Sequence, residues 1–124
     1  MTVRHFDWQA PCTVEATLAV IGGVWKPVIL FHLLDGSHRF SDLARVLPGA
    51  TARMLTRHLR ELEADGIVSR TVTPTVPPRV DYALTPLGAT LAPVLQAMRS
   101  WGADYQRQRH EAEGVLAAPG AMVR

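Results

Sequence analysis

Cysteine is almost absent from this 124-residue chain, and Cys12 is its one example. A single cysteine cannot form an internal disulfide and cannot build a cysteine-rich zinc site. The five histidines offer no alternative, because even the nearest two, His32 and His38, are divided by a helix end and a turn. We therefore expect neither a bound metal nor a cofactor.

Long apolar runs are missing as well. The longest helical apolar run, Val28 to Phe31, is far shorter than a membrane span. The first twelve residues include Arg4 and Asp7 and contain no apolar segment of the kind found in signal peptides. We expect a cytoplasmic location and no association with a membrane.

Recognisable catalytic motifs are also missing. The sequence has no glycine-rich phosphate loop, no nucleophile elbow and no HExxH zinc motif. We therefore expect a protein that is not an enzyme. Its hydrophobic content of 48% and charged content of 19% are those of a folded globular chain. The length is that of one domain with a sizeable core.

Lysine is scarce, because Lys26 is the one basic residue among thirteen that is not arginine. Arginine matches phosphates and guanine edges better than lysine does. The net charge is only +2 and the pI is about 9.2, but seven arginines stand against four acidic residues between Arg39 and Arg79. A basic stripe in a chain of modest net charge is typical of a DNA-binding domain, although ordinary solvated surfaces carry such stripes too.

Helix signals in the first half of the chain predict a helix-turn-helix over residues 41–65. Before it, helices are expected over residues 12–21 and from Pro27 as first residue to about residue 34, with a very short strand at residues 39–40. Ser41 would cap the first helix of the pair, and Thr51 would cap the second. A tight turn at Pro48-Gly49 joins them, which is the pattern of a helix-turn-helix.

The second half of the chain predicts a wing and a long helix. Strand signals over residues 67–73 and 80–84 predict a wing hairpin over residues 67–84, with three prolines at its tip. A last helix is expected over residues 86–110, kinked or broken near Pro93, followed by a flexible tail over residues 114–124. The predicted fold class is therefore mostly α with a small β-hairpin (α+β), a winged helix-turn-helix with extra terminal helices.

The second helix of the pair has its charges inverted, since arginines crowd its start and acidic residues crowd its end. The helix dipole favours the opposite arrangement, so helix stability does not explain it. Three arginines fall within about 60° of each other on the helix, opposite three leucines. That face fits the major groove of DNA, and the alternative is a solvated basic face. The residues predicted to contact DNA are Arg39, Ser41, Thr51, Arg53, Thr56, Arg57, Arg60 and Arg79.

The last helix carries apolar residues at a heptad spacing. Such a seam is more often core than partner surface, but here the terminal helices offer more apolar surface than one small core can cover. An isologous dimer is the economical solution. The residues predicted at the dimer interface are Val14, Leu18, Leu91, Val94, Met98, Trp101 and Tyr105.

Cys12 begins the first predicted helix, and a helix N-terminus can make a thiol reactive. Cys12 is therefore a candidate redox sensor. The alternative is a small buried hydrophobic residue, which is what a free cysteine usually is.

Short motifs spread over residues 12–102 resemble those of the HxlR family, bacterial winged helix-turn-helix regulators related to the MarR group. The segments that carry the resemblance are Cys12 with Val14-Glu15, Ile21-Gly22-Gly23 with Trp25-Lys26, Arg39-Phe40-Ser41, Leu47-Pro48-Gly49, Arg53-Met54-Leu55-Thr56, Leu59-Arg60-Glu61-Leu62-Glu63, Asp65-Gly66, Val76-Pro77-Pro78-Arg79-Val80 and Leu84-Thr85-Pro86-Leu87-Gly88. Two departures are Val24, where lysine is common, and Thr75, where an acid is common.

The resemblance implies a homodimer that binds an inverted-repeat operator in double-stranded DNA. Some members of the family sense oxidants or electrophiles through a cysteine near the position of Cys12. Because this chain has no second cysteine, a disulfide switch would have to join Cys12 of two subunits or involve a small thiol.

The leading hypothesis is a homodimeric, sequence-specific transcriptional regulator, expected to be a repressor and open to control by an oxidant, an electrophile or another small effector. The alternative is a winged-helix module that binds proteins and not DNA. Thiol sensing through Cys12 would operate on top of DNA binding.

Overall fold

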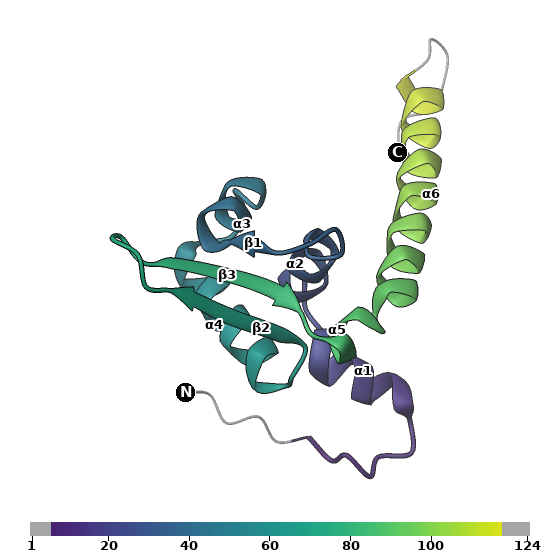
Figure 1. Cartoon of the computed structure of the whole chain (residues 1–124). Helices are drawn as coiled ribbons and strands as arrows, with labels where there is room; N and C mark the ends of the chain where they lie inside the picture. Colours follow the sequence, from purple (N-terminus) through teal and green to yellow (C-terminus); the bar gives the residue numbers. More distant parts are fainter. Residues whose placement is uncertain (1–5, 118–124) are drawn as a thin grey trace. The chain divides into compact units, whose positions relative to one another are not determined.

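The computed structural model describes residues 6–117, and its elements are shown in Figure 1. The chain divides into two compact units, residues 1–92 and residues 93–124, each of which is described by itself. The second unit contains nearly all of α6 (Ala92–Ala117). The elements of the first unit are α1 (Thr13–Ile21), α2 (Trp25–His32), β1 (His38–Arg39), α3 (Phe40–Val46), α4 (Ala52–Ala64), β2 (Val68–Thr73), β3 (Arg79–Leu84) and α5 (Pro86–Ala89).

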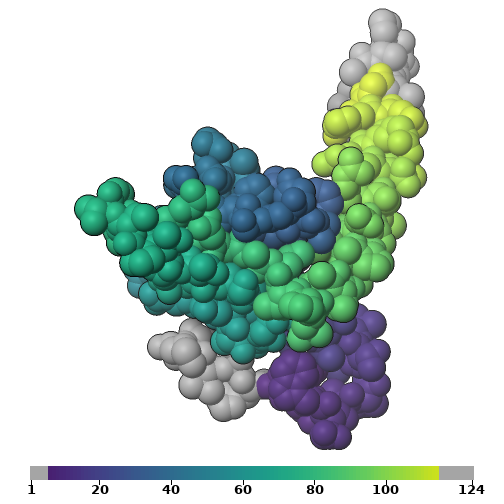
Figure 2. All heavy atoms as spheres, viewed as in Figure 1, coloured from purple at the N-terminus to yellow at the C-terminus, as the bar shows by residue number. Residues whose placement is uncertain are grey.

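Strands β1, β3 and β2 form an antiparallel sheet in that order, with β3 in the centre. The hairpin is in register from Val68 opposite Leu84 to Thr73 opposite Arg79. The segment between β2 and β3 is the tip of the wing, which protrudes from the surface of the first unit (Figure 2). The predicted hairpin is therefore confirmed.

The core of the first unit lies between the helices α2, α3 and α4 and the start of β2. Helix α4 contacts both α2 and β2, so it is held from two sides. The predicted leucine face of α4 is confirmed, because its three leucines have lost essentially all solvent contact. The largest fully buried side chains are Ile29, Leu30, Leu33, Leu43, Leu55, Leu59, Leu62 and Val68.

Helix α4 begins and ends where its sequence predicts. The Thr51 hydroxyl oxygen accepts a hydrogen bond from the backbone N–H of Met54 at 3.1 Å, which satisfies one of the donors that a helix start leaves open. Gly66 follows the helix with φ +76°, a left-handed conformation that glycine adopts without a steric penalty. The turn at Pro48-Gly49 separates α3 from α4, so the predicted helix-turn-helix is present.

The starts of α2 and α3 differ from the prediction. Pro27 is the third residue of α2 rather than the first, a position where its missing N–H is also not needed by the helix. Ser41 does not cap α3, because Arg39 holds the cap position and the helix begins at Phe40. The cause is the sheet, since Arg39 pairs with Asp81 as part of β1, and the chain turns into the helix directly afterwards.

Helices α1 and α2 meet at a sharp bend of 74°. The predicted end of α1 at Gly22 is confirmed, and Gly23 continues in the left-handed region with φ +89°. Within the described residues no single helix is long and apolar enough to span a membrane, and α1 with α2 reaches that length and composition only as this bent pair.

The predicted break before Pro93 is confirmed. Thr85 caps α5 by accepting the backbone N–H of Gly88, and α5 ends at Ala89. Helix α6 then begins at Ala92, which places Pro93 in its first turn, where proline is tolerated. The helix continues to Ala117, beyond the predicted end at residue 110, so the first residues of the tail predicted over residues 114–124 are helical instead. The rest of that predicted tail, residues 118–124, lies outside the described residues.

Candidate nucleic-acid interface

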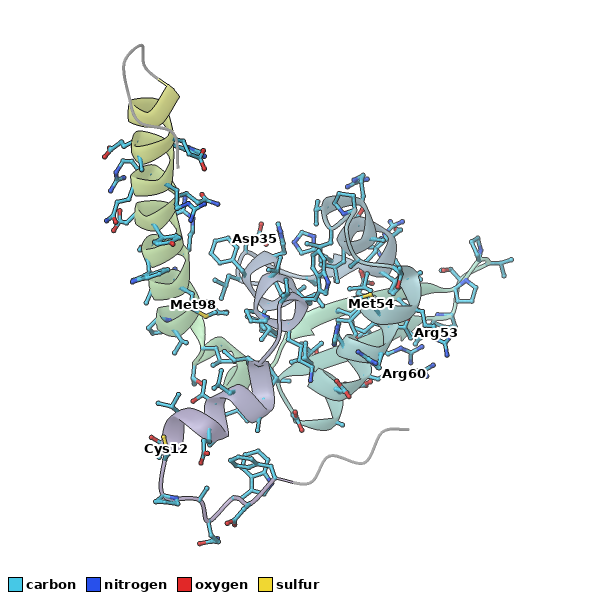
Figure 3. The ribbon with its side chains drawn as sticks, turned by 180° about the vertical axis from the view of Figure 1, so that it is seen from behind. Cys12, Asp35, Arg53, Met54, Arg60 and Met98 are labelled. Atoms are coloured by element: carbon cyan, nitrogen blue, oxygen red, sulfur yellow. The ribbon has the colours of Figure 1, made fainter. Side chains whose placement is uncertain are left out.

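Helix α4 has one buried face and one basic face. The three leucines of α4 point inward, and Arg53, Arg57 and Arg60 lie on the opposite side of the helix, where all three are exposed. Figure 3 shows Arg53 and Arg60 extending from the same side of α4. Because the leucines fix the rotation of the helix about its axis, the guanidinium groups must face solvent.

None of these three guanidinium groups has a carboxylate within 4.0 Å among the described residues. Several other arginines do have acidic partners, namely Arg45 with Asp42, Arg79 with Asp81, Arg107 with Asp104 and Arg109 with Glu113. The arginines of α4 therefore form a surface of uncompensated positive charge, which is what an anionic partner requires.

A buried ion pair joins α4 to α2, and sequence reasoning missed it. The Lys26 Nζ lies 2.8 Å from Glu61 Oε1, and the side chains are only 8% and 18% exposed. The one lysine of the chain is thus part of the core boundary rather than the basic surface. Its apolar neighbours in α2 indicate burial, but nothing in the sequence identifies a partner from a helix so far along the chain.

His58 lies beside this pair on α4. Its Nδ1 is buried, has no hydrogen-bond partner within the described part of the chain, and lies 3.9 Å from Glu61 Oε1. Burial lowers the pKa of His58 below 6.5, the positive charges of Arg57 and Lys26 lower it further, and Glu61 opposes them. His58 is therefore neutral at neutral pH and adds no charge to the basic face.

The two threonines predicted to contact DNA are both engaged with the helix. Thr51 provides the cap, and the Thr56 hydroxyl donates to the carbonyl oxygen of Ala52 at 2.8 Å. In this conformation Thr56 offers a partner its methyl group and an acceptor oxygen.

Arg79 begins β3, next to the tip of the wing, and has an acidic partner. Its Nε donates to both carboxylate oxygens of Asp81, at 3.2 and 3.0 Å. Residues two apart in a strand share a face, so this pairing was visible in the sequence but was not predicted. The Arg79 side chain is still 47% exposed, and its contact with DNA stays a prediction.

The sheet brings Arg39 and Arg79 together around the same acidic residue. Asp81 lies opposite Arg39 in the pairing of β1 with β3, and Arg79 binds it along β3. Ser41 is exposed in the first turn of α3. At the wing tip, Thr75 donates to the carbonyl oxygen of Pro77 at 2.8 Å, and Val76 is fully exposed.

The residues predicted at a dimer interface are mostly exposed in the single chain. Val14 and Leu18 are exposed on α1, and Leu91 is half-buried in the turn before α6. Along α6, four apolar or aromatic residues are exposed, and the rings of two of them are stacked with centroids 5.2 Å apart. A core role within one chain does not account for these four residues, which are Val94, Met98, Trp101 and Tyr105.

Cys12 occupies the cap position before α1, and its thiol is free and exposed (Figure 3). The alternative of a small buried hydrophobic residue is therefore wrong. An exposed thiol is open to solvent oxidants and to a second thiol.

The helix pair α3–α4, the wing and the basic face of α4 define a winged helix-turn-helix protein of the DNA-binding type. Residues 20–110 match the HxlR-like helix-turn-helix family, and the chain belongs to that family. It is a transcriptional regulator of the helix-turn-helix type, as its relatives are.

Two relatives come from Bacillus subtilis. The chain is 47% identical over 107 residues to the HTH-type transcriptional regulator YdeP, covering 86% of this chain and 84% of YdeP. It is 54% identical over 91 residues to the HTH-type transcriptional regulator YybR, covering 73% of each.

Among solved structures, the chain is similar to the redox regulator HypR. The reduced form gives a TM-score of 0.76 at 48% identity and covers 81% of this chain and 99% of HypR. The oxidised form gives a TM-score of 0.73 at 53% identity and covers 75% of this chain and 96% of HypR.

Proposed function

We propose that this protein is a homodimeric, sequence-specific repressor that binds an inverted-repeat operator in the bacterial cytoplasm. The observation that carries the proposal is the basic face of α4, where three exposed arginines stand opposite a fully buried leucine face and have no acidic partner among residues 6–117. An α-helix of this kind fits the major groove, and we expect the wing beside it to approach the neighbouring backbone.

Each DNA-contacting residue has a proposed role. Arg53 and Arg57 read base edges with Thr56 beside them, while Arg60 and Arg79 hold phosphates or the adjacent minor groove. Thr51, Arg39 and Ser41 contact the backbone at the edges of the site. A bidentate arginine–guanine contact contributes about 1–3 kcal/mol of discrimination against a wrong base.

The salt dependence of operator binding tests DNA recognition. If the dimer neutralises about six to ten phosphates, log K should fall with log salt at a slope of about −5 to −9. Fluorescence anisotropy against DNA selected from random or genomic fragments gives this slope, and Arg60→Ala should make it shallower. A flat response, or no DNA binding at any salt, would reject the proposal and favour a winged-helix module that binds proteins.

The dimer is proposed from the exposed seam of α6 together with Val14 and Leu18 of α1. Apolar side chains of this size each contribute about 1.5–3 kcal/mol when they are fully buried, so a second copy is a favourable cover. Met98→Arg should convert the protein to a monomer in sedimentation experiments. Gln96→Arg adds the same charge to the opposite side of α6 and should leave the dimer intact, and a Met98→Arg dimer would contradict the interface.

Regulation through Cys12 is proposed from its exposed thiol, with support from the similarity to HypR, whose name describes a redox regulator. A two-electron oxidant such as a peroxide would take two electrons from two Cys12 thiols, which lose two protons and form one intersubunit disulfide. Cys12→Ser should bind operator normally but ignore the oxidant. A mutant that responds like the parent would eliminate Cys12 as the sensor.

A further inference from the structure

The ion pair of Arg79 with Asp81 leaves the outer end of the guanidinium group open. Both hydrogen bonds, at 3.2 and 3.0 Å, come from Nε of the arginine. In the pair of Arg107 with Asp104 on α6, by contrast, the terminal Nη2 binds the carboxylate. Arginine has five N–H donors, one on Nε and four on the terminal nitrogens. A carboxylate bound at Nε therefore leaves the terminal donors of Arg79 for a second anion.

The sheet fixes the position of Asp81. This residue lies in the central strand β3, directly opposite Arg39 of β1 and Thr71 of β2. Arg79 pairs with Thr73 at the end of the same hairpin, where the tip of the wing begins. Residues two apart on a strand share a face, so the carboxylate reaches the guanidinium group along β3. The Asp81 side chain is 19% exposed and that of Arg79 is 47% exposed, so the anchor is more buried than the group it holds.

Such an anchor has two opposite effects on DNA binding. A free arginine side chain has many rotamers and loses that freedom when it binds a phosphate, whereas an arginine already held at Nε loses less. Its terminal nitrogens can then bind a phosphate through two parallel hydrogen bonds. The carboxylate itself, however, is a negative charge close to DNA and repels it. The sign of the effect of removing Asp81 therefore tells which of the two is larger.

We propose that Asp81 is a positioning residue for DNA binding: it holds Nε of Arg79 so that the terminal nitrogens bind a backbone phosphate beside the wing. This inference rests on the proposed function, and it assigns Arg79 to a phosphate rather than to the minor groove. Asp81 makes no contact with DNA itself. Arg39, on the other side of Asp81, has no carboxylate within 4.0 Å among residues 6–117, and its charge limits the repulsion between Asp81 and DNA.

If Asp81 only neutralised Arg79, Asp81→Ala would bind DNA more tightly, because it removes an acidic group from a basic surface. Under the positioning role, Asp81→Ala should instead raise Kd about threefold to tenfold, the effect of ordering one long side chain in each subunit. Operator affinity is measured by fluorescence anisotropy at fixed ionic strength, and thermal unfolding of each variant checks its folding.

Two variants separate the hydrogen bond from the charge. Asp81→Asn removes the same charge but keeps an acceptor oxygen for Nε, so Kd should stay within about twofold of the parent. Asp104→Ala releases Arg107 on α6 and makes the same change in net charge outside the proposed site, so its Kd should stay within about the same twofold range. If Asp81→Ala does not fold, Asp81→Val, a good strand former without an acceptor, takes its place with the same expectation.

A cycle with Arg79→Gln tests the same step independently. Once Arg79 is replaced, Asp81→Ala should not weaken binding any further, because the group that it positions is gone. A phosphate contact carries no sequence information, so Asp81→Ala should raise Kd for operator and for non-specific DNA by the same factor. Unchanged or tighter binding by Asp81→Ala, a further loss in the Arg79→Gln background, or a loss confined to operator DNA would overturn this inference while the proposed function stands.

NMR of the protein without DNA tests whether Asp81 orders the arginine. The Arg79 Nε–H should exchange slowly with water in the parent and rapidly in Asp81→Ala, because the hydrogen bonds to the carboxylate protect it in the parent alone. Equal exchange in the two proteins would overturn the positioning role. A parent protein that binds no DNA at any salt concentration would reject the proposed function and this inference together.

Discussion

Replacing Thr51 with alanine tests whether the recognition helix depends on its cap. The Thr51 hydroxyl accepts the backbone N–H of Met54 at 3.1 Å, and Arg53 lies in the turn that this bond closes. Loss of a threonine cap costs about 1 kcal/mol, with the lower part of the range applying here because Thr51 is exposed. Such a loss makes fraying of the first turn about fivefold more favourable.

Two readouts follow from this loss. The melting temperature should fall by about 3–6 °C for a domain of this size, measured by circular dichroism at one protein concentration. Operator affinity should also fall, but by less than in Arg53→Ala, because the arginine is still present and must only be ordered on binding.

Two variants make the Thr51→Ala result interpretable. Thr51→Ser keeps the cap and should behave like the parent. Thr17→Ala makes the same chemical change inside α1, where alanine is a better helix former, and should not lower the melting temperature. If Thr51→Ala matched the parent in both melting temperature and operator affinity, the proposed dependence of the recognition helix on its cap would be refuted.

Two further predictions concern pH and close packing. Because the pKa of His58 in the folded protein is below 6.5, the unfolded chain binds more protons than the folded protein as the pH falls through 6.5. The free energy of unfolding should therefore decrease over this range, and it should decrease less in His58→Gln. Equal pH profiles of the two proteins in denaturant titrations would contradict this. Gly88→Ala would place its Cβ against the Ile67 carbonyl oxygen and should cost about 1–3 kcal/mol of stability. Gly102→Ala would meet no atom of the described residues within 4 Å and should be neutral or stabilising. Similar stabilities of the two variants would argue against the close approach at Gly88.

Periodicity was sufficient to predict α4 and the wing. The leucines and arginines of α4 fall on opposite sides of any regular helix, so their burial and exposure follow from the sequence once the helix is assumed. The three prolines at the wing tip and the cap at Thr85 likewise act locally, and the structure places them as expected.

The features that the sequence did not predict depend on tertiary contacts. Ser41 is a good cap by its chemistry, but pairing of Arg39 in β1 fixes the start of α3 before it. The ion pair between Lys26 and Glu61 joins residues that are far apart in the sequence, and no local sequence pattern links them. Trp101 and Met98 are exposed in the single chain because no other part of it packs against them. A heptad spacing predicts an apolar seam but does not tell whether the same chain covers it.

If the arginine face of α4 reads operator sequence, its loss should reduce the preference for operator over other DNA. The most direct test measures the ratio of operator to non-specific affinity in the double variant of Arg53→Ala with Arg57→Ala. A double variant of Arg107→Ala with Arg109→Ala on α6 loses the same charge from exposed residues outside the proposed site. We expect the ratio to fall by at least about tenfold in the first variant and to stay near the parent value in the second. Equal ratios in the two variants would contradict it.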